Sequence, residues 1–127
     1  MIKFLKFIFC VSVLLLIILS LYPGSLIGYF LYGNLYQQPN LIPNPFGTTI
    51  NHFISYIYIS LLGFLLYLRS KNFQKLFYGM IFLSTTLELL QSVIPVRTFQ
   101  LGDLIANLLG VLVAYFLVKI YLRSSNV

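Results

Sequence analysis

The chain has 127 residues, of which 60% are hydrophobic and 8% are charged, and its formal net charge is +6. A mean hydropathy of +0.96 leaves too little polar surface for a water-soluble domain of this size and indicates an integral membrane protein. Nucleic-acid binding is excluded as the reason for the positive charge, because the basic residues are scattered singly at expected helix ends and form no stripe or arm.

The first apolar segment, residues 4–22, follows Lys3 and is long enough to cross a bilayer about 30 Å thick. A signal peptide is the alternative, since a basic start and an apolar core are typical of one. No small-residue cleavage site of the A-x-A kind follows, because the next residues read YPGS. We therefore expect a retained first transmembrane helix.

The connection at residues 23–49 contains four of the five prolines and no charged residue. This composition predicts irregular structure over most of its length. Its tyrosines and phenylalanines suit the headgroup layer of a membrane, where an aromatic ring is half apolar and half hydrated. We expect an extracytoplasmic loop that serves either as an anchored connector or as a lid over a binding site.

Residues 50–68 form the second predicted span. Thr48 or Thr49 is expected to cap its N-terminus by accepting a hydrogen bond from a backbone amide. His52 and Tyr56 are four residues apart, so they lie on one face of this helix, near the end that leaves the loop.

The third predicted span covers residues 76–94 and follows a short basic loop. Ser84, Glu88 and Gln91 share one face of this helix. At 1.5 Å per residue, Glu88 lies about 10 Å from the expected helix end. The sequence therefore predicts a carboxyl group inside the membrane.

The fourth predicted span, residues 103–122, is about 30 Å long if it is fully helical. Asp103, Asn107, Gly110 and Ala114 follow one another at helical spacing and share a face. This face carries polar residues near the start of the helix and small residues further along, as close helix packing in lipid requires.

Seven of the eight basic residues fall on one side of the membrane if all four spans cross it, and only Arg97 falls on the other. The excess of Lys and Arg on cytoplasmic sides predicts that both termini are cytoplasmic. The predicted fold is all-α, a single integral membrane domain over residues 1–127 with four transmembrane helices. Six polar side chains should then gather at the extracytoplasmic side: His52, Glu88, Gln91, Arg97, Asp103 and Asn107.

Two interpretations of this polar cluster follow. A carboxylate in hydrocarbon costs about 3 kcal/mol, so Glu88 must be paired, neutral or hydrated. In the structural interpretation, Glu88 and Arg97 form an ion pair across the turn, and Asp103 caps the fourth helix. In the functional interpretation, the planar guanidinium of Arg97 binds an anionic headgroup, for which phosphate is the best match. Glu88 or His52 would then move a proton.

Hydrogen bonds from Gln91 and Asn107 would orient such a ligand. No metal site is predicted, because one histidine and two acidic residues occur at spacings unlike those of metal ligands. The sequence has no GxSxG, phosphate-loop or dinucleotide motif, so it implies no cofactor.

The spacing E..Q...P.R.....D...N..G, which runs from Glu88 to Gly110, resembles the VanZ-like family of small bacterial membrane proteins. The H...Y spacing of His52 and Tyr56 adds to the resemblance, which covers roughly residues 48–115. It implies an association with resistance to teicoplanin, a lipid-bearing glycopeptide antibiotic that acts at the outer membrane face. Glu88 and His52 are the catalytic candidates, and the expected ligand-binding residues are Arg97, Gln91, Asp103, Asn107 and Tyr56.

The chain departs from the family pattern at two places. Members commonly carry an Asp-Lys pair four and three residues before the histidine, where this chain has Thr48 and Thr49. A small polar residue is usual three positions after the arginine, where this chain has Gln100. If the Asp-Lys pair takes part in chemistry, the protein is a divergent or inactive member.

Three hypotheses for function follow. The first is a multi-pass protein of the bacterial cell membrane that binds or modifies an anionic lipid or a lipid-linked cell-wall precursor at the outer leaflet. The second is a small transporter or flippase. Such a protein needs a polar path that continues inward, and the nearly uniform apolar character of residues 111–118 counts against it. The third is a structural partner subunit whose polar cluster holds helices together. A chain this short buries little around its pocket, which is compatible with a homo-oligomer.

Overall fold

A computed structural model describes residues 1–40 and 42–125. This part of the chain is all-helical and has no strand, and four of its helices are long and apolar enough to span a membrane. The predicted fold class is therefore confirmed. The four long helices are α1 (Ile2–Leu21), α3 (Thr49–Leu66), α4 (Phe73–Leu90) and α5 (Leu101–Ser125), and the shorter α2 (Leu26–Tyr32) lies between the first two.

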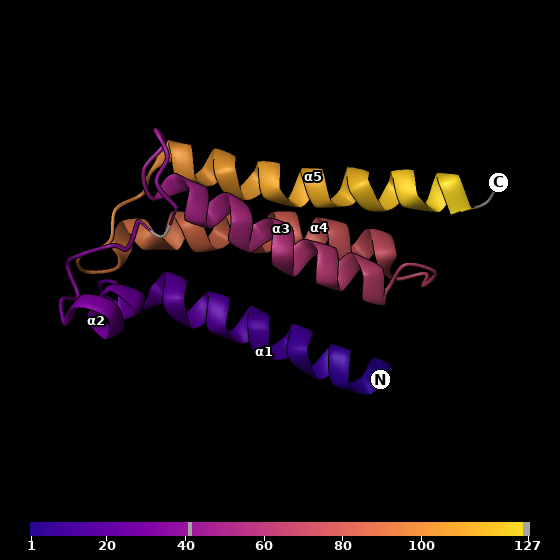
Figure 1. Cartoon of the computed structure of the whole chain (residues 1–127), viewed down its shortest axis with the longest axis horizontal. Helices are drawn as coiled ribbons and strands as arrows, with labels where there is room; N and C mark the ends of the chain where they lie inside the picture. Colours follow the sequence, from indigo (N-terminus) through magenta and orange to yellow (C-terminus); the bar gives the residue numbers. More distant parts are fainter. Residues whose placement is uncertain (41, 126–127) are drawn as a thin grey trace.

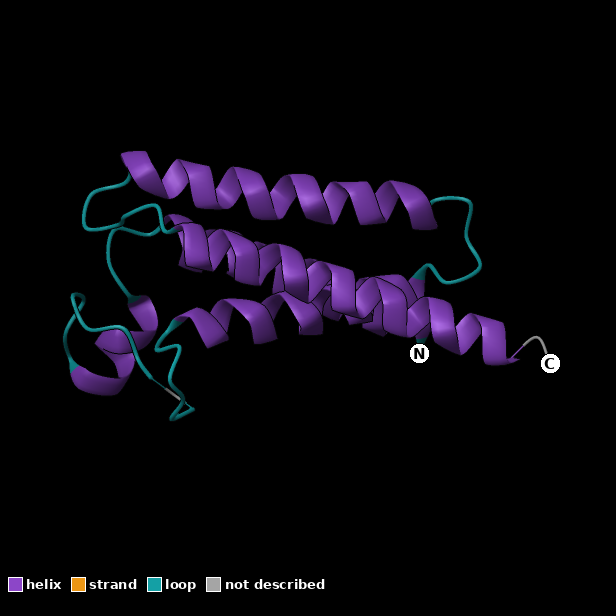
Figure 2. Cartoon of the chain, turned by 90° about the horizontal axis from the view of Figure 1, so that it is seen from above, coloured by secondary structure: helices purple, strands orange, loops and turns teal. Residues whose placement is uncertain are grey.

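The four long helices run side by side as a bundle, with the N-terminus and the end of α5 at the same end (Figure 1). Helix α5 packs against α3 and α4, and α1 packs against the same two helices. The short α2 and the connection between α4 and α5 lie at the opposite end of the bundle, as the view from above also shows (Figure 2). We call this opposite end the α2 end.

Helix α4 begins and ends earlier than the predicted span of residues 76–94. Its last turn tightens into the 3-10 helix η1 (Gln91–Val93), and Ile94 is extended, with φ −85° and ψ 132°. The proline at position 95 explains this end, because its ring disfavours helical backbone at the residue before it.

The connection between α1 and α3 is more ordered than the sequence analysis predicted, because it contains α2. The Ser25 side chain accepts a hydrogen bond from the amide of Gly28 at 3.0 Å and caps the start of this helix. Gly33 ends it in the left-handed conformation, with φ 68°. A Cβ atom at Gly28 would lie 1.7 Å from the carbonyl oxygen of Gln37, so α2 packs tightly against the residues that follow it.

Helices α3 and α5 approach each other most closely at Gly110. A Cβ atom at this position would lie 2.7 Å from the carbonyl oxygen of Phe53 and 2.9 Å from Cβ of Tyr56. Ala114, one turn further along α5, is fully buried. The predicted face of small residues is confirmed as a contact between backbones. This contact brings the polar residues at the starts of α3 and α5 within hydrogen-bonding distance.

The half of the bundle near the chain ends holds an aromatic cluster. The rings of Phe77 and Tyr115 lie 4.3 Å apart between their centroids, and those of Phe64 and Phe73 lie 5.5 Å apart. Phe64, Val111 and Val118 are buried among the same helices. The polar cluster of the α2 end therefore meets aromatic and aliphatic side chains in the other half of the bundle.

Candidate functional site

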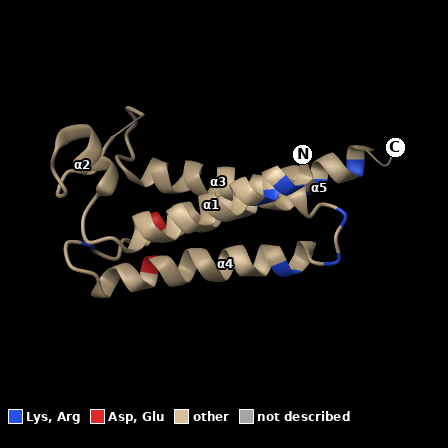
Figure 3. Cartoon of the chain, turned by 90° about the horizontal axis from the view of Figure 1, so that it is seen from below, with Lys and Arg blue, Asp and Glu red and all other residues tan. Residues whose placement is uncertain are grey.

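The buried polar residues of the three most tightly packed helices meet at the α2 end. Figure 3 shows both acidic residues in the half of the bundle nearer α2, whereas most Lys and Arg residues lie near the chain ends. Glu88 is 1% exposed in the last turn of α4, and Asp103 is 6% exposed in the first turn of α5. The histidine that faces them, His52, lies in the first turn of α3 and is partly buried.

Asn107 connects the carboxylate of Glu88 with the imidazole of His52. Its Nδ2 donates to Oε2 of Glu88 at 3.4 Å, and its Oδ1 lies 3.2 Å from Nδ1 of His52. The other oxygen of Glu88 accepts a hydrogen bond from the backbone amide of Gln100 at 3.2 Å. The buried carboxylate of Glu88 on α4 therefore binds the α4–α5 connection directly and is linked through Asn107 of α5 to His52 of α3.

Asp103 completes the cluster on the α3 side. Its Oδ2 lies 3.4 Å from Nε2 of His52, and its Oδ1 accepts a hydrogen bond from the Thr49 hydroxyl at 2.8 Å. The prediction that Thr48 or Thr49 caps the second span is wrong, since neither side chain makes a capping hydrogen bond. The Thr49 hydroxyl binds Asp103 instead. Position 49, where the VanZ-like pattern has a lysine, thus contacts the site.

Arg97 binds the end of α1. Its Nε donates to the carbonyl oxygen of Tyr22 at 3.1 Å, and its Nη2 donates to that of Leu19 at 2.5 Å. The predicted ion pair between Glu88 and Arg97 is wrong, because no such pair occurs within residues 1–40 and 42–125. The unsatisfied carbonyls at a helix C-terminus carry partial negative charge and attract the guanidinium.

The backbone before Arg97 is strained. Val96 has φ 66°, a left-handed conformation that β-branched residues rarely adopt. Such a residue costs about 1–3 kcal/mol and persists only where the surrounding structure imposes it. The amide of Arg97 donates to the carbonyl of Ile94 at 3.2 Å, which closes a tight turn. This turn directs the arginine side chain back toward α1.

Burial lowers the pKa of the Arg97 guanidinium from its ordinary value, while the nearby carboxylates of Glu88 and Asp103 act in the opposite direction. The ordinary pKa of an arginine side chain lies so far above neutral pH that the guanidinium keeps its charge in proteins. The α2 end therefore holds a fixed cation beside two buried carboxyl groups.

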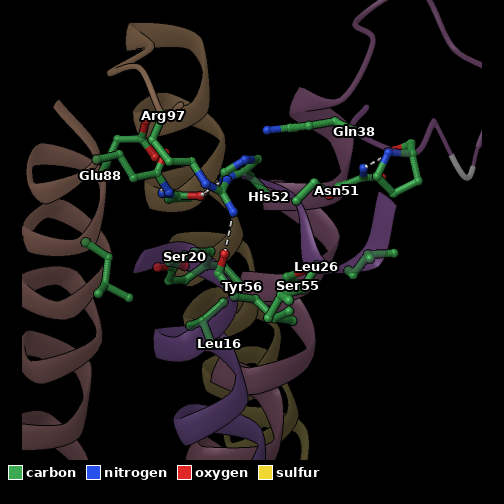
Figure 4. A pocket seen from close by; sticks show the side chains of 17 residues that line it. Leu16, Ser20, Leu26, Gln38, Asn51, His52, Ser55, Tyr56, Glu88 and Arg97 are labelled. Carbon is green, nitrogen blue, oxygen red and sulfur yellow. Dashed lines mark hydrogen bonds between the residues drawn. The ribbon is translucent and has the colours of Figure 1, made fainter. Parts of the chain in front are cut away.

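A cavity of about 120 Å³ opens beside these groups. In Figure 4, Glu88, Arg97 and His52 lie together near one end of it, and Leu16 of α1 lies near the other. Pockets that enclose whole ligands of drug size measure about 300–1,000 Å³. This cavity is large enough for a phosphate-sized group or a few water molecules, but not for a lipid chain.

Six of the seven predicted site residues line the cavity. The seventh, Asp103, does not line it but contacts His52, which does. The six are His52, Tyr56, Glu88, Gln91, Arg97 and Asn107. Sequence reasoning missed the contribution of α1, which supplies Leu16, Leu19 and Ser20 to the cavity wall. A helix-end carbonyl that accepts from an arginine has no side-chain signature, so no signal in the sequence marks it.

The structure also brings together residues that the sequence analysis did not group as metal ligands. One nitrogen of His52 and one carboxylate oxygen each of Glu88 and Asp103 lie within 4.8 Å of one another. These residues come from three different helices. Motifs for metal ligands depend on short spacings within one segment, so a site built across helices is not visible in the sequence.

A protein-family model described as VanZ/LLP1 matches residues 7–122. No curated protein and no solved structure matches the chain. The match extends beyond residues 48–115, over which the resemblance was noted, and includes most of α1, all of α2 and every residue of the polar cluster. The chain therefore belongs to the VanZ/LLP1 family.

Proposed function

We propose that this VanZ/LLP1 protein binds the headgroup of an anionic lipid or a lipid-linked cell-wall precursor at the outer leaflet of the bacterial cell membrane. This binding lowers the susceptibility of the cell to teicoplanin. The observation that carries the proposal is a half-buried guanidinium, that of Arg97, held at the wall of a cavity that His52 and Glu88 also line.

The distribution of charge supports the outer-leaflet location. All the basic residues except Arg97 lie at or near the end of the bundle that carries the chain termini (Figure 3). Basic residues concentrate on the cytoplasmic side of membrane proteins. With that end in the cytoplasm, the cavity opens toward the outer leaflet.

Arg97 has donors left for a ligand. A guanidinium carries five N–H groups, and two of them bind the carbonyls of Leu19 and Tyr22. Three are thus available within the part of the chain that the structure describes. A planar set of donors fits phosphate oxygens, and the two helix-end carbonyls hold the guanidinium in place before the ligand arrives.

The surroundings of the cavity suit a ligand with an apolar tail outside the cavity. Leu26 and Ile27 of α2 form part of its wall, while Tyr29 and Phe30 on the same helix are 51% and 80% exposed. Exposed aromatic rings at a helix beside the cavity are typical of the membrane interface. The headgroup would enter the cavity, and the acyl or prenyl chain would stay in the bilayer.

Proton transfer would belong to His52 or Glu88 if the ligand is also modified. Asp103 lies against one nitrogen of His52 and Asn107 against the other. A base held by a second polar group is the arrangement that general acid–base chemistry needs. Binding through Arg97 does not depend on this step.

The experiment is a susceptibility assay in a teicoplanin-sensitive bacterium that expresses the wild type, Arg97→Ala or Glu88→Gln at equal membrane abundance. We expect the wild type to raise the inhibitory concentration of teicoplanin and both variants to lose that increase. Vancomycin, which lacks the lipid chain, should show little change. Arg123→Ala is the matched control, because it removes one exposed cation from the far end of α5.

The outcomes separate the alternatives. A wild type that gives no protection, or an Arg97→Ala variant that protects as well as the wild type, contradicts the proposal. If Glu88→Gln is less abundant in the membrane but each molecule protects as well as the wild type, the result favours a structural subunit. A flippase would need a polar path through the bundle, and the aromatic cluster of α3, α4 and α5 lies where that path would run.

A further inference from the structure

We propose that His52, Glu88 and Asp103 bind one divalent transition-metal ion. The chain contains one histidine and two acidic residues, and all three converge on one point at the α2 end. Their ligand atoms lie within 4.8 Å of one another although they come from α3, α4 and α5. A metal site would explain why every side chain of these types in the chain is gathered there.

The hydrogen bonds of Asn107 indicate which nitrogen of the His52 imidazole carries a hydrogen on the Asn107 side. A carboxylate only accepts hydrogen bonds, so the Asn107 amide must present its nitrogen to Glu88. Its oxygen then faces Nδ1 of His52, which must carry the hydrogen. A histidine that binds a metal through Nε2 keeps its hydrogen on Nδ1, and this arrangement would direct the Nε2 lone pair toward Asp103, where an ion would bind both groups.

The separation of these two atoms fits a shared metal ion better than a proton. Nε2 of His52 and Oδ2 of Asp103 are 3.4 Å apart. A charge-assisted N–H···O bond is about 2.7–2.9 Å long. Two ligands each about 2.1 Å from a tetrahedral zinc ion lie about 3.4 Å from one another. The Glu88 oxygen is the third ligand, and because the three ligand atoms lie within 4.8 Å of one another, a small side-chain movement completes the set.

Each proposed ligand has an outer partner that orients it. The Thr49 hydroxyl donates to Oδ1 of Asp103, which leaves Oδ2 for the ion. Asn107 accepts from His52, and the backbone amide of Gln100 donates to Glu88. Protein metal sites commonly hold their histidine and carboxylate ligands by such partners.

Charge and donor type define the class of ion. Carboxyl groups bind a metal in their ionised form, so Glu88 and Asp103 would together bring two negative charges, which a divalent cation neutralises. Arg97 does not neutralise them by direct contact, because its side-chain hydrogen bonds go to the carbonyls of Leu19 and Tyr22. One imidazole and two carboxylates suit Zn²⁺ or Mn²⁺ rather than the soft ion Cu⁺. The cavity beside His52 and Glu88 supplies space for water at a remaining coordination position.

The test uses the full chain purified without a histidine tag, stripped with a chelator and placed in phosphatidylcholine nanodiscs. Zn²⁺ binding is measured by titration calorimetry and by metal analysis after dialysis. We expect one Zn²⁺ per chain. The isosteric variants Glu88→Gln and Asp103→Asn, together with His52→Ala, should weaken binding more than about 100-fold. Thr49→Val should weaken it about 10- to 100-fold, because it removes only an outer partner.

Cys10→Ser is the matched control, since Cys10 is the one other side chain that is a strong zinc ligand and lies exposed on α1. It should bind Zn²⁺ like the wild type. Co²⁺ in the wild type should give visible absorption bands that His52→Ala lacks.

Two results would overturn the proposal. One is a helical, monodisperse wild type that retains no stoichiometric Zn²⁺, in which case His52 and Asp103 form a protonated ion pair. The other is Zn²⁺ binding that survives in all three ligand variants. Neither result bears on the Arg97→Ala arm of the resistance assay, because Arg97 is not one of the proposed metal ligands.

Discussion

Gly110→Ala is expected to lower the free energy of unfolding of the bundle by about 1–3 kcal/mol, the usual cost of an added group in a packed interior. The new methyl group would lie 2.7 Å from the carbonyl oxygen of Phe53 and 3.1 Å from the amide nitrogen of Ile57. These are backbone atoms of α3, so the clash is relieved only if α3 and α5 move apart. Thermal or denaturant unfolding in detergent micelles measures the loss.

Gly79→Ala is the control for this substitution. It adds the same methyl group to α4, where a Cβ atom meets nothing within 4 Å. Alanine favours a helix over glycine by up to about 1 kcal/mol, so this variant should be as stable as the wild type or more stable. Equal stability losses in both variants would show that α3 and α5 do not depend on close contact at Gly110.

Movement of α5 away from α3 should also disturb the polar cluster. Thr49 and His52 on α3 contact Asp103 on α5 across the same interface. We therefore expect Gly110→Ala to lose any teicoplanin protection that the wild type gives, even at equal membrane abundance. A fully protective Gly110→Ala variant would show that the exact distance between these helices does not matter for function.

Asn107→Leu is expected to destabilise the protein by about 2 kcal/mol. The side chain is 2% exposed and lies between Glu88 and His52. Its removal leaves a carboxylate oxygen and an imidazole N–H without partners, and each such buried group costs about 1–3 kcal/mol. Hydrogen bonds within membranes often contribute less free energy than those in water. The expected loss of stability therefore lies near the lower end of the summed cost of the two unpaired groups. Unfolding in micelles measures it.

Gln74→Leu provides the comparison for Asn107→Leu. It also exchanges an amide for leucine, but Gln74 is exposed on α4, and its one side-chain hydrogen bond is a 3.4 Å contact from the Tyr115 hydroxyl. It should change stability by less than about 0.5 kcal/mol, as surface substitutions usually do. If Asn107→Leu is as stable as Gln74→Leu, the amide does not hold the cluster together.

The sequence by itself determined the class of the protein and the residues to examine. Four apolar segments of membrane-spanning length cannot fold as a soluble domain, and in lipid their backbones must form helices to satisfy their own hydrogen bonds. Polar groups inside such helices are costly, so Glu88, Asn107 and Asp103 stood out as candidates. Helical periodicity also placed Gly110 and Ala114 on the contact face, as the structure confirms.

The tertiary structure alone decided which partner each polar group has. One of the two interpretations paired Arg97 with Glu88, but the strained turn at Val96 directs the Arg97 side chain to the carbonyls of Leu19 and Tyr22. Thr48 or Thr49 was expected to cap a helix, but the close approach of α3 to α5 places Asp103 within hydrogen-bonding distance of the Thr49 hydroxyl. These outcomes depend on the distances between helices. The spacing of residues along one helix shows which residues share a face, but it does not show how far that face lies from another helix. For the same reason, the convergence of a histidine and two carboxylates from three helices became visible only in the folded bundle.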